Sequence, residues 1–289
     1  MELLTEPFAY GFMRTALLAG LLTVVSSSLV GTWIVMRGLA FMGDALAHGV
    51  LPGIAVAYLM GTSLLLGAAA GAVVMVLGVS AASSRRGIGQ DTAIGLLFVG
   101  MLALGVTIIS ARGAYAGDLA TILFGDPIGV GSSALRVLVV AALVALVASV
   151  LLYRPFLALT YDRSKAKVLE MRPGAAHLAM LALIAMVVVT SFRAVGTMLV
   201  VAFLIAPPAS AVLIVRRVPL IMLTSMLFGT FAVVVGLVLS FRFSTATSAT
   251  IAGLTVVQFF IVLVAVTLVD RWRGHPYATP GPSPVPVGA

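Results

Sequence analysis

Long apolar runs recur along this chain and are separated by short polar connections. A helix needs about 20 predominantly apolar residues to cross the hydrocarbon core of a bilayer. Nine runs approach or exceed this length, so the sequence predicts an all-α polytopic membrane protein with nine transmembrane helices, eight to ten being compatible with the pattern. The predicted spans are residues 12–36, 39–60, 63–82, 92–111, 133–152, 174–192, 196–214, 219–240 and 250–269.

The composition excludes a water-soluble globular protein. Hydrophobic residues make up 62% of the chain and charged residues 9%, with a mean hydropathy of +1.22, which leaves too little polar surface to face water. We interpret residues 1–273 as one transmembrane domain. Residues 274–289 contain five prolines in sixteen positions, and this composition predicts a disordered tail. Cysteine is absent, so any metal site must use oxygen and nitrogen ligands.

The basic residues predict the orientation of the chain. Lys and Arg are enriched in cytoplasmic loops, so we interpret the net charge of +8 by its location and not as a nucleic-acid surface. Alternating the sides from a cytoplasmic C-terminus places twelve basic residues inside and five outside. The N-terminus is therefore predicted to be external. No basic segment and no small-residue cleavage site mark a signal peptide, so the first span is expected to be retained.

An aspartate and a histidine lie four residues apart within the second apolar run, in FMGDALAHGVLPGI. On a helix, Asp44 and His48 share one face. A charged residue at the centre of a span costs about 2.5–3.5 kcal/mol or more, so such residues mark functional sites. We predict that this pair faces a cavity and binds a metal ion. The alternative is that the two side chains pair with each other or with backbone carbonyls and hold helices together.

Helix-breaking residues accompany this pair. Gly49, Pro52 and Gly53 follow it directly, and a proline removes a backbone N–H and disfavours helical geometry in the preceding residue. The sequence thus predicts a discontinuous helix around Asp44 and His48, an arrangement found in many transport sites. Pro207 and Pro208 predict a second break, in the seventh span. His177 and His275 are expected to be solvated and not part of this site.

Two connections are longer than the others. Residues 113–131 are predicted to be external, with Asp118 and Asp126 serving either turn formation or cation attraction. Residues 153–173 are predicted to be cytoplasmic, with a short helix capped by Asp162. The chain has only two lysines, both in SKAKV, and hence no Walker A loop. Transport must therefore depend on a separate ATPase, on an ion gradient, or on passive flow.

Five segments in order resemble the membrane permease subunits of the bacterial manganese/zinc/iron ABC importers, and the resemblance covers residues 12 to 269. They are FMGDALAHGVLPG, QDTAIGLLFVGMLALGV, DLATILFGD, the segment after Tyr161, and VGTMLVVAFLIAPPASAVLI. The resemblance implies a homodimeric permease in the bacterial plasma membrane, two cytoplasmic ATPase subunits and an extracytoplasmic metal-binding protein. It implies a transported divalent ion (manganese, zinc or iron), no permanently bound cofactor and no enzymatic activity of the chain itself. Asp44 and His48 match the metal pathway. The residues that match the ATPase-coupling helix are Asp162, Ser164, Lys165, Ala166, Lys167, Leu169 and Glu170.

The chain departs from that family at two places. Glu170 stands where the coupling segment usually ends in glycine, and residues 244–248 (STATS) lack the usual external acid followed by Pro-x-Gly. Two other functions remain open from the residues alone. An ion-gradient-coupled secondary metal transporter would exchange protons at Asp44 and His48. An intramembrane metalloenzyme would hold a catalytic metal there, but the chain lacks the H-E-x-x-H pattern.

Overall fold

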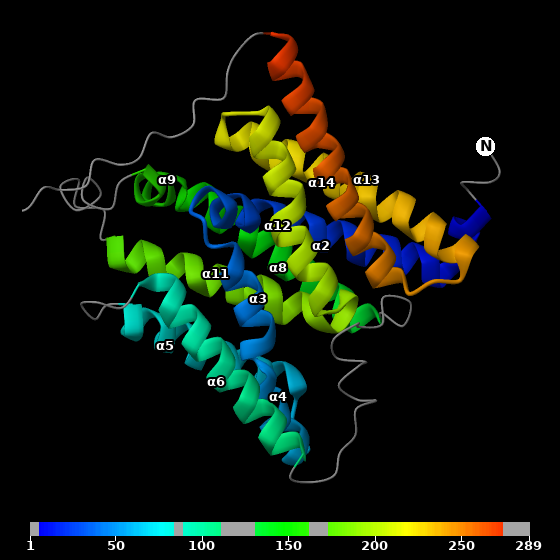
Figure 1. Cartoon of the computed structure of the whole chain (residues 1–289). Coiled ribbons are helices and arrows are strands. Elements are labelled where there is room, and N and C mark those ends of the chain that lie inside the picture. The colour runs from blue at the N-terminus through cyan, green and yellow to red at the C-terminus, as the bar shows by residue number, and fades with distance from the viewer. Residues whose placement is uncertain (1–5, 84–88, 111–130, 162–172, 274–289) are drawn as a thin grey trace, which may run out of the picture.

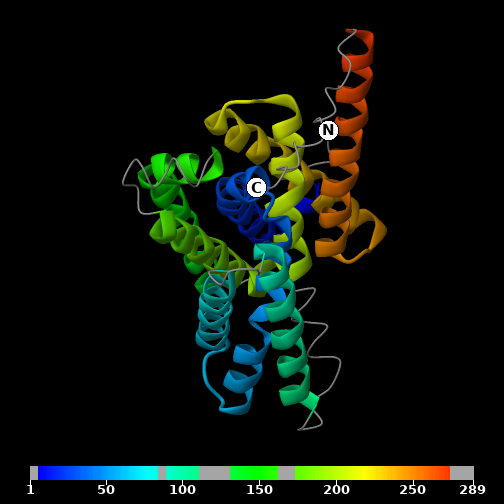
Figure 2. The same cartoon turned by 60° about the vertical axis from the view of Figure 1, so that its left-hand side comes forward.

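The structure is a computed structural model that describes residues 6–83, 89–110, 131–161 and 173–273. These residues are helical apart from short connections, and they contain no strand. The elements are η1 Glu6–Ala9, α2 Gly11–Met36, α3 Ala40–Gly49, α4 Leu51–Leu59, α5 Leu64–Ser83, α6 Gln90–Ser110, α8 Ser132–Leu151, α9 Tyr153–Tyr161, α11 Pro173–Val195, α12 Thr197–Ile214, α13 Val218–Phe243 and α14 Thr247–Trp272. Their arrangement is shown in Figures 1 and 2.

The predicted transmembrane helices are confirmed. Within the described ranges, nine helical segments are long and apolar enough to cross a membrane, with α3 and α4 together forming one of them. Each coincides with a predicted span, and the ends differ by only a few residues. The agreement arises because hydrophobic length is a strong signal for a segment that must satisfy all its backbone hydrogen bonds inside the bilayer.

Helix α2 forms the centre of the bundle and packs against α8, α11, α12 and α13. Two of its buried hydroxyl groups are bonded locally: Thr23 and Thr32 donate to the carbonyls of Ala19 and Ser28 at 2.9 and 2.7 Å. One polar contact joins two helices, because the Ser225 hydroxyl of α13 donates to the Ser28 hydroxyl at 3.0 Å. Small residues and hydroxyl contacts of this kind allow helices to associate closely where lipid provides no hydrophobic drive.

The predicted break after His48 is present. Helix α3 ends at Gly49, the connecting residue is Val50, and Pro52 occupies the first turn of α4, a position that tolerates proline because its N–H has no helical partner there. The chain turns at this point, and α4 lies between α5 and α6 (Figure 1). The segment that carries Asp44 and His48 therefore ends at a real discontinuity.

Glycines on the two neighbouring helices hold this break. A Cβ on Gly53 would collide with the backbone of Gly67 and Gly71 in α5, and a Cβ on Gly71 would lie 3.0 Å from the backbone of Val50. From α6, a Cβ on Gly105 would lie 2.9 Å from the Cβ of Leu51. The GAAAG sequence of α5 thus allows close helix packing, and its partner is the broken helix.

The second predicted break is wrong. Helix α12 continues through Pro207 and Pro208 from Thr197 to Ile214. The two prolines leave the carbonyls of Phe203 and Leu204 without their usual helical donors. Helix α2 approaches closely at this point, since a Cβ on Gly31 would collide with the Leu204 carbonyl oxygen. Tertiary packing therefore keeps α12 intact where local preference predicts an interruption.

The long connection after α8 begins with a helix that the sequence did not predict. Helix α9 covers Tyr153–Tyr161, and Phe156 is fully buried. The rings of Tyr153 and Phe156 meet the ring of Trp33 edge-on, at centroid distances of 5.7 and 5.6 Å. Contacts with α2 thus stabilise a segment whose own sequence resembles a loop. Residues 113–130, the coupling segment from Asp162 to Glu170, and the tail from residue 274 lie outside the described residues.

The turn between α13 and α14 contains the second departure from the resembled family. Ser244 ends α13 in left-handed geometry, with φ of 50°. The Ser240 hydroxyl donates to the Thr245 carbonyl at 2.7 Å and contacts the Thr247 hydroxyl at 2.9 Å. Hydroxyl groups therefore close this turn without the acid, the proline or the glycine.

Candidate metal site

Asp44 and His48 lie one turn apart on α3, as the sequence predicts. The His48 Nε2 atom is 3.6 Å from the Asp44 Oδ1 atom. The side chain of Asp44 is 38% exposed and that of His48 is 26% exposed. Both groups therefore keep a face that protein atoms do not cover, and a ligand can reach both from the same side.

The rest of α3 fixes the direction of these two side chains. Met42, Ala45 and Leu46 are fully buried on its other faces. A Cβ on Gly49 would lie 3.0 Å from the Met75 Cγ atom of α5, so the helix end is also closely packed. Burial of the apolar faces leaves the face with Asp44 and His48 turned outward, which is the arrangement that the i, i+4 spacing predicts.

The two polar side chains open into a cavity of about 450 Å³ between α3, α12 and α14. Its lining is mostly apolar, and the other groups with ligand atoms are the Thr197 hydroxyl and the Met198 thioether. Residues that line it are Asp44, His48, Thr197, Met198, Val201, Ala202, Ile205, Ala206 and Val256. A few polar groups converging in an apolar cavity are typical of small-ligand sites.

A glycine sets the position of Thr197 and Met198. Gly196 joins α11 to α12 with φ of 82°, a left-handed conformation that other residues rarely adopt. The sharp turn places the first residues of α12 at the cavity. Sequence reasoning missed both residues, although a Gly-Thr pair between two spans is a usable signal for such a turn.

An aromatic ring from α6 packs against the histidine. The Phe98 ring meets His48 edge-on at a centroid distance of 5.8 Å and meets Phe41 at 5.6 Å. These contacts limit the rotation of the imidazole and cover its apolar edge. Sequence reasoning also missed Phe98, because one phenylalanine within an apolar span carries no signal of its own.

Other predicted site residues lie elsewhere. The helix break is shaped by Gly49, Pro52 and Gly53, and none of them lines the cavity. The cavity is not lined by Pro207 or Pro208 either, although it is lined by the adjacent Ile205 and Ala206. Pro52 and Gly53 instead border an apolar groove of about 460 Å³ between α4, α5 and α6. In the described part of the chain, no group of three or more His, Asp or Glu residues could hold a metal ion.

His177 is not solvated, so that expectation is wrong. The residue is only 4% exposed, and its Nδ1 atom lies 3.2 Å from a guanidinium nitrogen of Arg37. The same guanidinium approaches the Met180 sulfur at 3.7 Å. Because arginine remains charged and can only donate, His177 accepts this hydrogen bond at Nδ1. The contact joins the connection between α2 and α3 to the first turns of α11.

One known protein family matches nearly the whole chain. The sequence matches the ABC 3 transport family over residues 9–267. The chain belongs to the ABC 3 transport family. This match runs from before the first span into the ninth and confirms the resemblance to permease subunits of metal ABC importers. Membership of a transport family is also consistent with a subunit that is not itself an enzyme.

Relatives of this ABC 3 family chain are named as metal transport proteins. The manganese transport system membrane protein MntC of Halalkalibacterium halodurans is 33% identical over 270 residues, covering 92% of each chain. The chelated iron transport system membrane protein YfeD of Yersinia pestis is 32% identical, covering 91% of this chain and 88% of the relative. Among solved structures, PsaBC from Streptococcus pneumoniae in complex with Fab matches with a TM-score of 0.79 and 29% identity, covering 90% of this chain and 94% of that one.

Proposed function

We propose that the chain is the membrane-spanning permease subunit of an ATP-driven importer of a divalent transition metal, with Asp44 and His48 as transient ligands of the ion. The observation that carries this proposal is the cavity between α3, α12 and α14, where a carboxylate and an imidazole 3.6 Å apart remain partly exposed in a mostly apolar wall. Relatives named for manganese and iron transport support the same cargo.

Two protein ligands are too few for a divalent ion, since zinc takes about four and larger ions take about six or more. We propose that a second copy of the chain supplies the remainder. In a two-fold dimer each surface meets its own copy, so an interface over the mouth of this cavity would add a second Asp44 and His48. The partial exposure of both side chains within this cavity supports the placement. Waters and the Thr197 hydroxyl are further candidate ligands.

The proposed importer needs partners that bind nucleotide and deliver the metal. No Walker A sequence exists in the chain, so ATP hydrolysis belongs to a separate cytoplasmic ATPase. We propose that residues Asp162 to Glu170 contact this ATPase and that an extracytoplasmic binding protein delivers the ion. Helix α11 begins directly after that segment, and its His177 contacts Arg37, seven residues before Asp44. This connection provides a short route from the coupling segment to the metal site.

The ligand types restrict the cargo only to a class. Carboxylate oxygen suits manganese, and imidazole suits zinc, iron and other transition metals. A thioether such as that of Met198 favours softer ions over calcium or magnesium. A transport site must also release its ion, so binding by few and partly exposed ligands is appropriate.

Metal uptake by cells provides the test. We would express the chain with its neighbouring ATPase and binding protein and measure Mn, Zn and Fe by elemental analysis. Asp44→Ala and His48→Ala should each lower uptake of the transported metal by at least about tenfold, with the complex still assembled. Asp270→Asn is the control, because Asp270 lies at the end of α14 and does not line the cavity. Unchanged uptake in both site variants would refute the metal role.

The same cells separate this proposal from an ion-gradient-coupled transporter. Inactivation of the partner ATPase by replacement of its Walker A lysine should abolish uptake. An uncoupler should have little immediate effect while ATP is maintained. The opposite pair of results would establish gradient coupling.

A further inference from the structure

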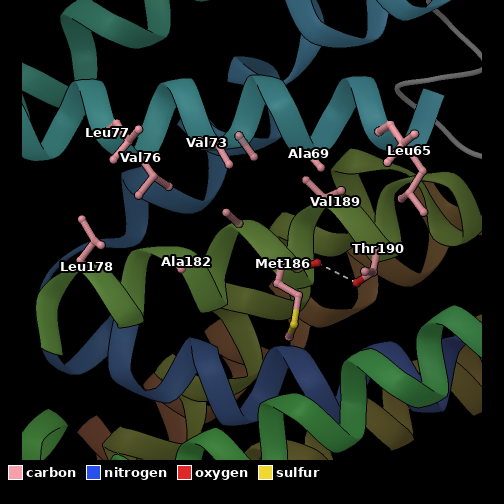
Figure 3. Close-up of a pocket in the computed structure, with 13 residues that line it drawn as sticks. Leu65, Ala69, Val73, Val76, Leu77, Leu178, Ala182, Met186, Val189 and Thr190 are labelled. Carbon is pink, nitrogen blue, oxygen red and sulfur yellow. Dashed lines mark hydrogen bonds between the residues drawn. The ribbon is translucent and has the colours of Figure 1, made fainter. Parts of the chain in front are cut away.

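Two apolar cavities adjoin on a face of the molecule away from the metal site. One has a volume of about 530 Å³ and lies between α5 and α11, as Figure 3 shows. The other has a volume of about 300 Å³ and lies between α8 and α11. Both are bordered by Met186 and Thr190 of α11. We call the two together the α11 trough; neither shares a helix with the cavity that contains Asp44 and His48.

The trough presents hydrocarbon along its length. The longer cavity is lined by alanine, valine, leucine and methionine side chains, and Thr190 is the only residue with a polar side chain. The Thr190 hydroxyl donates to the Met186 carbonyl of its own helix at 2.7 Å, as the dashed line in Figure 3 shows. The lining therefore leaves no polar side-chain group to be satisfied by water, and an apolar occupant is favoured.

The dimensions of the trough match one leaflet of a membrane. Along α5 its lining extends from Leu65 to Leu77, which is about 18 Å at 1.5 Å per residue. Half of a hydrocarbon core of about 30 Å is about 15 Å. The trough is also open to the surface along its length and belongs to helices that span the bilayer. An acyl chain can therefore lie along it, and packing against the side chains recovers dispersion contacts that an empty groove would lose.

A cation lies at one end of the trough. Arg136 borders the smaller cavity and is the fifth residue of α8, so it lies about 6 Å from the helix start. Its side chain is exposed. Within the part of the chain that the structure describes, it makes no hydrogen bond or ion pair. Arginine near the end of a transmembrane helix extends its guanidinium to the headgroup region, where lipid phosphates lie.

We propose that the α11 trough binds a phospholipid, with its phosphate on Arg136, one acyl chain between α5 and α11, and the other between α8 and α11. An acidic headgroup is preferred because Arg136 adds a net positive charge at the mouth. The bound lipid fills the space between α5, α11 and α8, and so it joins the unit of α4, α5 and α6 to the rest of the bundle. This inference depends only on the membrane location and not on the proposed metal transport.

Native mass spectrometry of the full chain in detergent, titrated with phosphatidylglycerol or phosphatidylethanolamine of equal chain length, tests the proposal. Wild type should bind phosphatidylglycerol about fivefold more tightly than phosphatidylethanolamine, the size of effect expected for one basic group near a headgroup. Arg136→Gln should remove this preference. Arg242→Gln is the control, since Arg242 is exposed near the end of α13 and does not border the trough.

A second pair of variants tests the acyl-chain site itself. Ala182 is exposed within the larger cavity (Figure 3), so Ala182→Phe should fill the groove without disturbing the core and should lower binding of both lipids. Ala103→Phe places the same side chain on an exposed position of α6 outside the trough and should bind lipid as wild type does. If wild type binds no phospholipid, or if Arg136→Gln and Ala182→Phe both bind as wild type does, the proposal is overturned. Size-exclusion profiles confirm that each variant remains folded.

Discussion

A single proline, Pro52, and a proline pair, Pro207 and Pro208, lie within apolar spans of this chain, and they affect their helices differently. Just before Pro52, α3 ends at Gly49 and α4 begins at Leu51. At Pro207 and Pro208 helix α12 continues without a break. Both sites are buried in the bundle, and each proline removes one backbone donor. The proline alone therefore does not decide whether a transmembrane helix breaks.

The neighbouring residues account for the difference. Pro52 is flanked by Gly49 and Gly53, and glycine disfavours helix by about 1 kcal/mol relative to alanine. Pro207 and Pro208 lie between Ala206 and Ala209, which favour helix most strongly. The partners differ as well: α5 and α6 contribute glycines that pack against the break, whereas α2 contributes Gly31 next to the freed Leu204 carbonyl.

The helix that ends before Pro52 and the helix that continues through Pro207 and Pro208 form opposite walls of the proposed metal site. The break ends α3 one residue after His48, so the helix that carries both ligands can change direction independently of α4. The continuous α12 contributes most of the cavity wall and provides a fixed surface opposite them. We interpret the cavity as having one adjustable wall and one rigid wall.

The largest effect is expected from Gly53→Ala. The new Cβ would collide with the backbone of Gly67 and Gly71, and backbone cannot move aside as a flexible side chain does. We expect a loss of at least about 3 kcal/mol of stability, seen as a lower thermal unfolding temperature and less monodisperse protein. Gly100→Ala in α6 is the control, because nothing lies within 4 Å of its added Cβ. A Gly53→Ala protein as stable as wild type would show that α5 does not hold the break.

Gly31→Ala tests the other site and should have a smaller effect. Its Cβ would overlap the backbone of one residue, at the Leu204 carbonyl, and otherwise meet the Pro208 ring, whereas a Cβ on Gly53 would overlap the backbone of two residues. We expect destabilisation of about 1–3 kcal/mol by thermal unfolding. Gly11→Ala in the same helix has open space around it and should be neutral or stabilising. Equal behaviour of the two variants would argue against close packing on the freed carbonyl.

Much of the fold was predictable because short stretches of the sequence determine it. Nine apolar runs indicate nine spans, and the i, i+4 spacing of Asp44 and His48 places both on one face of α3. The break at Pro52 was predictable from the adjacent glycines. These features depend on length, period and local helix preference, all of which are present in the sequence.

The remaining features depend on contacts between distant segments. Helix α12 continues through its prolines, and α9 forms beside Trp33, because other helices pack there. His177 is buried through its contact with Arg37, 140 positions away. Phe98 packs on His48 and Val256 lines the cavity, and neither apolar side chain carries a signal of its own in the sequence. No single segment contains this information.

Pro52→Ala should separate the role of the break from that of the glycines. It restores an N–H that can bond the His48 carbonyl and removes the restriction on Leu51, so α3 and α4 should become straighter. Gly49 and Gly53 remain, and we expect stability to change by about 1 kcal/mol or less. Metal uptake should nevertheless fall several-fold, because the ligand-bearing helix loses its independent end. Wild-type uptake in this variant would show that the glycines alone maintain the pathway.

Pro207→Ala is the matched change in the continuous helix and should have the smallest effect. A restored N–H can bond the Phe203 carbonyl, which favours the helix that is already present. Loss of the buried proline ring removes some packing, so the two contributions oppose each other and we expect a net change within about 1 kcal/mol. Metal uptake should remain within twofold of wild type. If Pro207→Ala instead lowers uptake as much as Pro52→Ala does at unchanged expression, then α12 also flexes during transport, and the distinction between an adjustable wall and a rigid wall is wrong.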